Sequence, residues 1–169
     1  MMKGLKDRGM VVTTKINVNE LYEFTMKHNY RSAAGILGVL FSLCSAVGGF
    51  IYWDKLTVTN RVLVVLFALM FTVIEPIGCY IKVKKQIKKS FQYPISYNFS
   101  SQGIEINVND EKALCHWHEV MKVESTSNLI NIYTSPVRAF IIPKKDVGDN
   151  MEILKEMIEK NAECRKVVL

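Results

Sequence analysis

The sequence predicts a membrane protein in which a two-helix transmembrane hairpin is joined to a small α+β cytoplasmic domain. Three observations in the 169-residue chain predict this class. Two long apolar runs, 33–53 and 62–81, lie in its first half, and basic residues flank their outer ends. Short segments with strand-like alternation follow residue 90 and lead to an amphipathic stretch, which predicts an antiparallel β meander closed by a C-terminal helix.

Residues 1–32 predict a cytoplasmic strand and an amphipathic helix. The segment MVVTTKINV places Val12, Thr14 and Ile16 on one face of a strand. Asn19 then suits the N-cap of a helix that leads into the first apolar run. The sequence leaves open whether this strand joins the C-terminal sheet.

Both apolar runs are long enough to cross a membrane. Residues 33–53 contain no charged side chain, and residues 62–81 contain only Glu75. A helix rises about 1.5 Å per residue, so about 20 apolar residues cross a hydrocarbon core of about 30 Å. A cleaved signal peptide and two buried core helices are the alternatives. A signal peptide should have a shorter apolar region close to the N-terminus, whereas residues 1–32 precede the first run here. The remaining sequence offers no layers to cover two buried helices. We therefore interpret both runs as membrane spans.

The distribution of charge predicts the orientation of this hairpin. Residues 1–32 hold six Lys or Arg against three Asp or Glu, and the connection 54–61 is nearly neutral. The basic juxtamembrane segment 82–89 has no acidic residue and contains five lysines: Lys82, Lys84, Lys85, Lys88 and Lys89. The positive-inside rule therefore predicts cytoplasmic termini and an outer connection. The pI of 9.1 then reflects topology, and nothing in the sequence indicates a nucleic-acid partner.

The first span carries small residues that predict close helix packing. The face consists of Ala34, Gly38, Ser42 and Ala46 at four-residue spacing, with Gly49 beside it. Small side chains allow helix backbones to approach each other in a bilayer. We expect the second span, or a second copy of the chain, to pack here.

Glu75 and Pro76 are the sharpest local feature of the second span. A carboxylate in hydrocarbon is costly and by default indicates a functional site. Pro76 lacks an N–H, and its ring crowds the carbonyl of Thr72, which predicts a bend. Val39, at a similar depth in the first span, offers no polar partner. The hypothesis is a hinge or a contact with a partner helix, and the alternative is a polar residue tolerated near the interface.

Residues 90–169 predict the β domain. Six short segments rich in Ile, Val, Tyr or Phe are separated by turn sequences such as SSQG, NDEK and SP. Residues 146–150 offer caps for a final helix whose apolar face comprises Met151, Leu154, Met157 and Ile158.

The sequence predicts no catalytic, metal or cofactor site. His116 and His118 share a strand face, but no third ligand stands at a recognised spacing. The four cysteines form no CxxC pair, and we expect no disulfide among them. No GxSxG segment and no glycine-rich phosphate loop occurs, so we do not expect an enzyme.

The order of these elements, with the run LCHWHEVMKVESTSNLINIYTSPVRAFIIPKKDV, resembles the YcxB-like family of small bacterial membrane proteins. The residues that carry the resemblance are Trp117, Val120, Lys122, Val123, Glu124, Tyr133, Ile141, Ile142, Pro143 and Lys144. The resemblance implies a pleckstrin-homology-like cytoplasmic domain and no assigned catalytic residues.

We therefore expect a membrane-anchored cytoplasmic binding or regulatory module in a bacterial cell membrane. Its expected partners are the lipid bilayer and either a second copy of itself or an unidentified membrane protein. Two alternatives stay open. The chain could be an oligomeric transport or channel component that uses Glu75, or a sensor of lipids or membrane stress.

Overall fold

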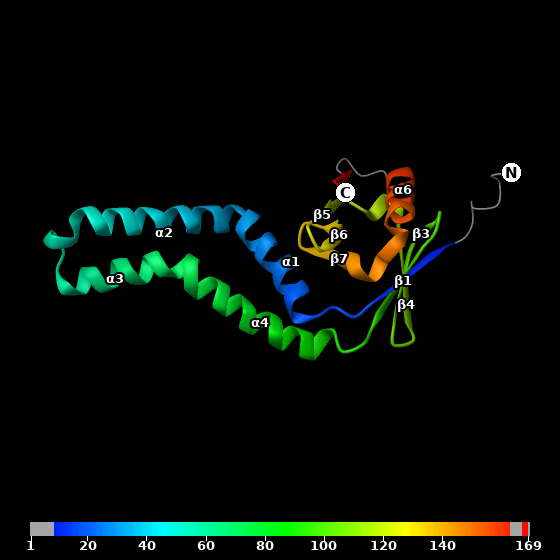
Figure 1. Cartoon of the computed structure of the whole chain (residues 1–169), viewed down its shortest axis with the longest axis horizontal. Coiled ribbons are helices and arrows are strands. Elements are labelled where there is room, and N and C mark those ends of the chain that lie inside the picture. Colours follow the sequence, from blue (N-terminus) through cyan, green and yellow to red (C-terminus); the bar gives the residue numbers. More distant parts are fainter. Residues whose placement is uncertain (1–8, 163–166, 169) are drawn as a thin grey trace. The chain divides into compact units, whose positions relative to one another are not determined.

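The computed structural model describes residues 9–162 and 167–168, which form two compact units (Figure 1). One unit contains the described residues up to Glu20 and those from Lys89 onward, and the other is Leu21–Lys88. The predicted pair of long apolar helices, the antiparallel strands and the C-terminal helix are confirmed. The helical unit is thus inserted in the sequence between two strands of the first unit.

The β domain contains two four-stranded sheets. The first has the antiparallel order β1 (Met10–Thr14), β2 (Ile95–Phe99), β3 (Gly103–Val108), β4 (Glu111–His116). The second has the order β7 (Arg138–Pro143), β6 (Leu129–Ser135), β5 (Lys122–Ser125), β8 (Val167–Val168). β8 pairs parallel to β5, whereas β5, β6 and β7 are antiparallel. The sequence predicted β2 to β7 but not β8.

The strand that precedes the helical hairpin belongs to the first sheet. β1 pairs antiparallel with β2, from Met10 opposite Phe99 to Thr14 opposite Ile95. Val12 and Thr14 are almost fully buried, whereas Val11 is 62% exposed. Alternate residues therefore face the core, as the period of a half-buried strand requires. This pairing answers the question that the sequence left open.

The core lies between the two sheets and the last helix, α6 (Met151–Asn161). The two sheets contribute fully buried side chains to this core, among them Phe99, Ile104, Val123 and Ile132. Leu154 and Ile158 of α6 belong to the same cluster. Met151 and Met157 are partly buried and pack against it, so all four apolar positions predicted for this helix face the core.

A short 3₁₀ turn, Trp117–Glu119, divides the predicted meander into its two sheets. The Trp117 side chain is buried, and its indole N–H donates to the carbonyl of Ser100 at 2.8 Å. Its ring stacks on Phe99, with ring centroids 6.4 Å apart. Trp117 therefore fixes the corner at which the chain leaves one sheet for the other.

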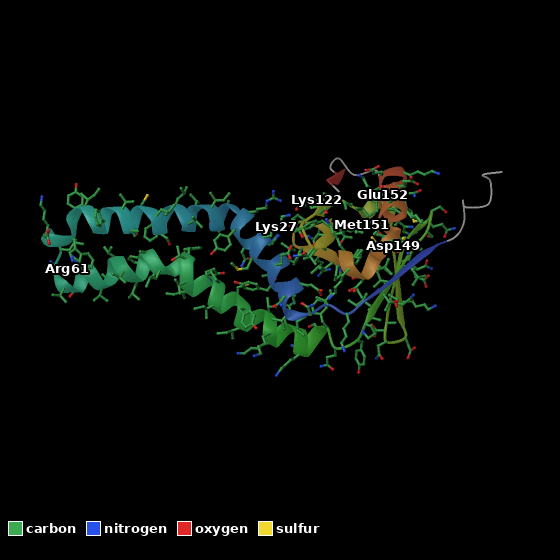
Figure 2. The ribbon with its side chains drawn as sticks, in the orientation of Figure 1. Lys27, Arg61, Lys122, Asp149, Met151 and Glu152 are labelled. Carbon is green, nitrogen blue, oxygen red and sulfur yellow. The ribbon has the colours of Figure 1, made fainter. Side chains whose placement is uncertain are left out.

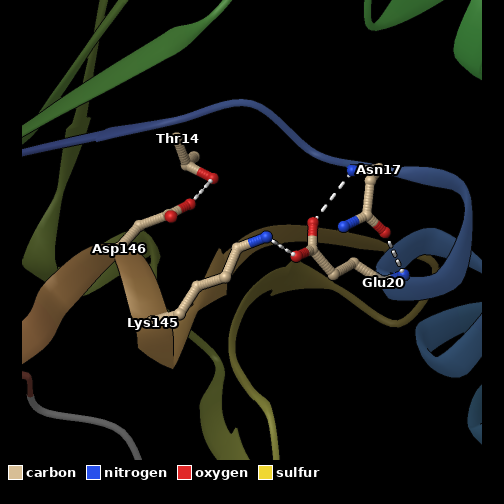
Figure 3. Close-up of polar contacts among 5 residues, drawn as sticks. All are labelled: Thr14, Asn17, Glu20, Lys145 and Asp146. Atoms are coloured by element: carbon tan, nitrogen blue, oxygen red, sulfur yellow. Dashed lines mark hydrogen bonds and ion pairs between the residues drawn. The ribbon is translucent and has the colours of Figure 1, made fainter.

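Residues 14–20 contact the short helix α5 (Lys144–Val147) through polar side chains, as Figure 3 shows. The Thr14 hydroxyl donates to Asp146 Oδ2 at 2.6 Å, and Lys145 Nζ lies 2.6 Å from Glu20 Oε1. This hydrogen bond to Glu20, together with its charge, raises the pKa of Lys145. The two contacts connect residues that are far apart in the sequence.

Asn17, not Asn19, caps the helix α1 (Val18–Arg31). Asn17 Oδ1 accepts from the Glu20 N–H at 3.0 Å, and Glu20 Oε2 accepts from the Asn17 N–H at 2.9 Å (Figure 3). This reciprocal arrangement satisfies two backbone donors at once. The prediction of Asn19 was wrong because it overlooked Glu20, which stands three residues after Asn17.

The burial of the Cys115 thiol can be tested through the pH dependence of the protein's stability. Burial, and then Glu119, raise the pKa of its thiol from 9.0 to about 11. A raised pKa in the folded state contributes stability below pH 9 that is lost as the pH rises toward 11. We expect the melting temperature, followed by tryptophan fluorescence, to fall less steeply over this range in Cys115→Ala than in wild type. Parallel profiles would contradict the burial of the thiol.

The helical unit is a long hairpin preceded by α1. Its helices are α2 (Ala33–Tyr52), α3 (Val58–Leu69) and α4 (Glu75–Ser90), with a π-helical turn, Met70–Ile74, between the last two. A 3₁₀ turn, Trp53–Lys55, leads to α3, and the Thr57 hydroxyl accepts from the Asn60 N–H. Figure 2 shows Arg61 at this end of the hairpin, where its Nε donates to the Trp53 carbonyl.

The helices of the hairpin meet at small residues of α2. Gly35, Gly38, Ser42 and Gly49 are buried. A Cβ on Gly38 would lie 2.1 Å from the Phe71 ring, and one on Gly49 would lie 2.3 Å from Val64. The Ser42 hydroxyl donates to the Phe67 carbonyl at 3.0 Å.

Two residues of the predicted small-residue face, Ala34 and Ala46, lie outside this contact and are exposed in the unit. A strict four-residue spacing rotates about 40° per step around a helix of 3.6 residues per turn, so it drifts off the contact line. Gly38, Ser42 and Gly49, which are separated by steps of four and seven residues, stay on it. Within the hairpin, the buried residues therefore include Gly38, Ser42 and Gly49 of the predicted face.

Candidate functional site in the helical hairpin

The π-helical turn before Pro76 is the structural basis of the candidate site. The Glu75 N–H donates to the Met70 carbonyl, five residues earlier. The same spacing directs the Phe71 carbonyl toward position 76, where proline has no hydrogen to donate. π-helical turns of this kind occur frequently at functional sites. The carbonyl that Pro76 leaves without its helical donor is thus that of Phe71, one residue before the Thr72 that the sequence predicted.

Tyr30 of α1 supplies the missing donor. Its hydroxyl donates to the Phe71 carbonyl. A backbone carbonyl without a partner in an apolar environment is costly, so this contact stabilises the interrupted helix. The sequence predicted α1 but gave no reason to connect it with the second apolar run.

Glu75 also has its partner in α1. Asn29 Nδ2 donates to Glu75 Oε1 at 3.3 Å, and the carboxylate is half-buried. Among the described residues, Glu75 forms no ion pair. Asn29, Tyr30, Ser32, Ala34, Gly35, Phe71 and Glu75 line a cavity of about 240 Å³. Glu75 is the one residue with a charged side chain in that lining.

Residues at the junction between α1 and α2 also line this cavity. Ser32 caps α2, because its Oγ accepts from the Gly35 N–H at 3.0 Å and donates to the Asn29 carbonyl at 2.6 Å. A Cβ on Gly35 would lie 2.0 Å from that carbonyl oxygen. Glycine at position 35 therefore allows the backbones to approach closely enough for Asn29 to reach Glu75.

The structure places the five lysines of the predicted basic segment on α4, downstream of the cavity. Lys82, Lys84, Lys85, Lys88 and Lys89 are all exposed, while Val83 between them is buried. One unbroken helix therefore carries Glu75, Pro76 and the whole basic segment. No irregular segment separates the second apolar run from its lysines.

The two histidines of the CHWH sequence lie at the end of β4 and in the following turn. Their rings stack with centroids 5.4 Å apart, and the His116 N–H donates to Glu119 Oε2 at 2.7 Å. Across residues 9–162 and 167–168, no group of three or more His, Cys, Asp or Glu side chains is placed to hold a metal ion. The Cys44, Cys79 and Cys115 thiols are free, and Cys164 lies outside the described residues.

One comparison with known proteins matches a large part of the β domain. The model of the YcxB-like protein family matches residues 99–159. The chain carries a YcxB-like domain. No curated protein and no solved structure matches the chain.

The YcxB-like segment begins at the last residue of β2 and ends within α6, so it excludes β1 and the helical hairpin. Most of the residues that carried the resemblance are structural. Trp117, Val120, Val123 and Ile142 are buried in the core. Lys122 forms an ion pair with Glu124 at 3.2 Å and lies over the Tyr133 ring, 4.2 Å from its centroid. These residues account for the fold of the YcxB-like domain and indicate no reaction.

Proposed function

We propose that the protein is a membrane-anchored binding module, in which the hairpin crosses a bacterial cell membrane and holds the YcxB-like domain at its cytoplasmic face. The observation that carries the proposal is the apolar surface of the hairpin. Phe50 is 88% exposed, Val58 76% and Leu37 66%, and no residue of α3 is buried. Exposed apolar patches of this extent are unfavourable in water and normal in lipid. Both helices have the length and composition of membrane spans.

The pairing of β1 with β2 supports two crossings. The chain leaves the domain after Thr14 and returns at Ile95, and these two residues are paired. Both ends of the hairpin thus belong to one folded domain, which requires an even number of crossings. The lysines of α4, each attracted to an anionic leaflet by about 1 kcal/mol, favour the cytoplasmic side for that domain.

The YcxB-like domain offers surfaces for a protein partner. A four-stranded sheet, a second sheet and a closing helix are consistent with a pleckstrin-homology-like fold. β4 is the edge strand of the first sheet, and most of its residues are exposed. An edge strand can bind an added strand through its backbone groups. Burial raises the pKa of the Cys115 thiol, which disfavours that thiol as a nucleophile.

The cavity beside Glu75 favours a second candidate, a transport component. Two spans form no pore alone, so several copies would have to assemble around Glu75. That function predicts cation or proton flux in liposomes that is lost in Glu75→Gln. A lipid or membrane-stress sensor would instead change the protease sensitivity of the YcxB-like domain with lipid composition.

Cysteine labelling in intact bacterial cells tests the topology. We expect a membrane-impermeant maleimide to label Lys55→Cys, in the outer connection, without permeabilisation. Lys112→Cys, whose side chain is 72% exposed on β4, should react only after the membrane is opened. Labelling of Lys112→Cys in intact cells would contradict the cytoplasmic placement of the domain.

Purification of the full-length protein from its host membrane in mild detergent tests the binding role. A second protein in stoichiometric amount would support an adaptor or regulator. Self-association with bulk lipid alone would count against a protein partner.

A further inference from the structure

We propose that the cavity beside Glu75 binds the ammonium group of a primary amine. The inference rests on the membrane anchoring proposed above, because it places the cavity near the lipid headgroups. It assigns a ligand class to a cavity in which Glu75 is the one residue with a charged side chain.

The cavity carries a negative charge, because Glu75 is the one residue with a charged side chain in its lining. The Tyr30 hydroxyl donates to the Phe71 carbonyl, and the Ser32 hydroxyl both donates to Asn29 and accepts from Gly35. These groups are already satisfied by the protein. Glu75 differs, because one amide hydrogen bond from Asn29 does not neutralise its charge. The cavity therefore favours a cation and disfavours an anion.

The second step is the kind of cation. Calcium takes six to eight oxygen ligands, and magnesium requires an octahedral set. This cavity presents one carboxylate, and no cluster of metal ligands exists among the described residues. An ammonium group needs only a carboxylate and a few acceptors, and it also binds the faces of aromatic rings. Phe71 and Tyr30 supply such rings in the lining.

The third step is size and position. A volume of about 240 Å³ exceeds that of a single ion or water, since one water occupies about 30 Å³. It has room for an aminoethyl group. Glu75 lies seven residues before Lys82 on one helix, or about 10 Å along its axis, and the lysines there attract lipid phosphates. The ammonium could thus come from an ethanolamine lipid headgroup or from a soluble amine.

Lipid retention tests the inference. Full-length protein would be reconstituted into nanodiscs with equal amounts of phosphatidylethanolamine, phosphatidylcholine and phosphatidylglycerol, and its retained lipids counted by native mass spectrometry. We expect wild type to retain phosphatidylethanolamine over phosphatidylcholine, whose trimethylated nitrogen donates no hydrogen bond. Glu75→Gln preserves the acceptor for Asn29 but removes the charge, and should reduce this preference about tenfold. Asp54→Asn, an exposed carboxylate in the connection, should leave it unchanged.

The outcomes distinguish a lipid headgroup from a soluble amine as the source of the ammonium group. They also distinguish failure of this inference from failure of the proposed anchoring. Displacement of the lipid by free ethanolamine would assign the site to soluble amines, whereas persistence of the lipid would assign it to the headgroup. Equal retention of both lipids by wild type, or an unchanged preference in Glu75→Gln, would overturn the inference alone. Failure of wild type to enter the nanodiscs would overturn the proposed anchoring, and this inference with it.

Discussion

Replacement of Gly35 by alanine is expected to destabilise the helical hairpin by about 3 kcal/mol. The new Cβ would lie 2.0 Å from the backbone oxygen of Asn29, which cannot rotate away as a side chain could. Relief of this clash must move α1 relative to α2, and that movement would separate Asn29 from Glu75. The measurement is thermal unfolding of the purified full-length protein in detergent.

Gly48→Ala is the matched control for this substitution. It introduces the same methyl group into the same helix, but a Cβ there has no neighbour within 4 Å. Alanine is a better helix former than glycine, so Gly48→Ala should leave stability unchanged or raise it by up to about 1 kcal/mol. Equal behaviour of the two variants would show that α1 and α2 do not approach each other as described.

The long helices and the strands could be predicted because their signals are local. An uncharged run such as 33–53 can be recognised from length and composition, and the alternation in segments such as GIEINV needs only neighbouring residues. The helical conformation of the lysine-rich segment 82–89 could be predicted in the same way, because it directly continues the second apolar run. Residue types within one element therefore fixed its type, its approximate bounds and the face of α6 that is buried.

The partners across the candidate site could not be predicted in the same way. Tyr30 and Phe71 are 41 residues apart, and Asn29 and Glu75 are 46 apart. No spacing rule connects such pairs, since they depend on how α1 turns into α2. A signal was nevertheless present for one of them. A proline within a long apolar helix leaves one carbonyl without its helical donor, and α1, which precedes the apolar runs, offers a tyrosine.

The π-helical turn explains why Pro76 leaves the Phe71 carbonyl, and not that of Thr72, without a helical donor. In a regular α-helix Pro76 would deprive the carbonyl four residues earlier, which is that of Thr72. The wider turn from Met70 to Ile74 shifts the pairing by one residue. Sequence patterns give no reliable sign of such a turn, because it adds one residue without changing the apolar character of the helix.

Val12→Asp is expected to unfold the β domain or destabilise it by about 3–5 kcal/mol, which is much of a small domain's stability. Val12 is 2% exposed and belongs to the core cluster with Phe99 and Ile104. A carboxylate at this position would be buried without a partner cation. In the full-length variant, we expect the thermal transition in tryptophan fluorescence to disappear or to move to a lower temperature. We also expect a protease to digest the domain rapidly.

Val11→Asp provides the comparison that isolates β1. Val11 is the preceding residue of the same strand, and its side chain is 62% exposed on the opposite face. The same charge there should change stability by less than about 0.5 kcal/mol, as most surface substitutions do. If Val12→Asp were equally mild, β1 would not belong to the sheet. The argument that both ends of the hairpin enter one domain would then fail, and with it the structural support for two crossings.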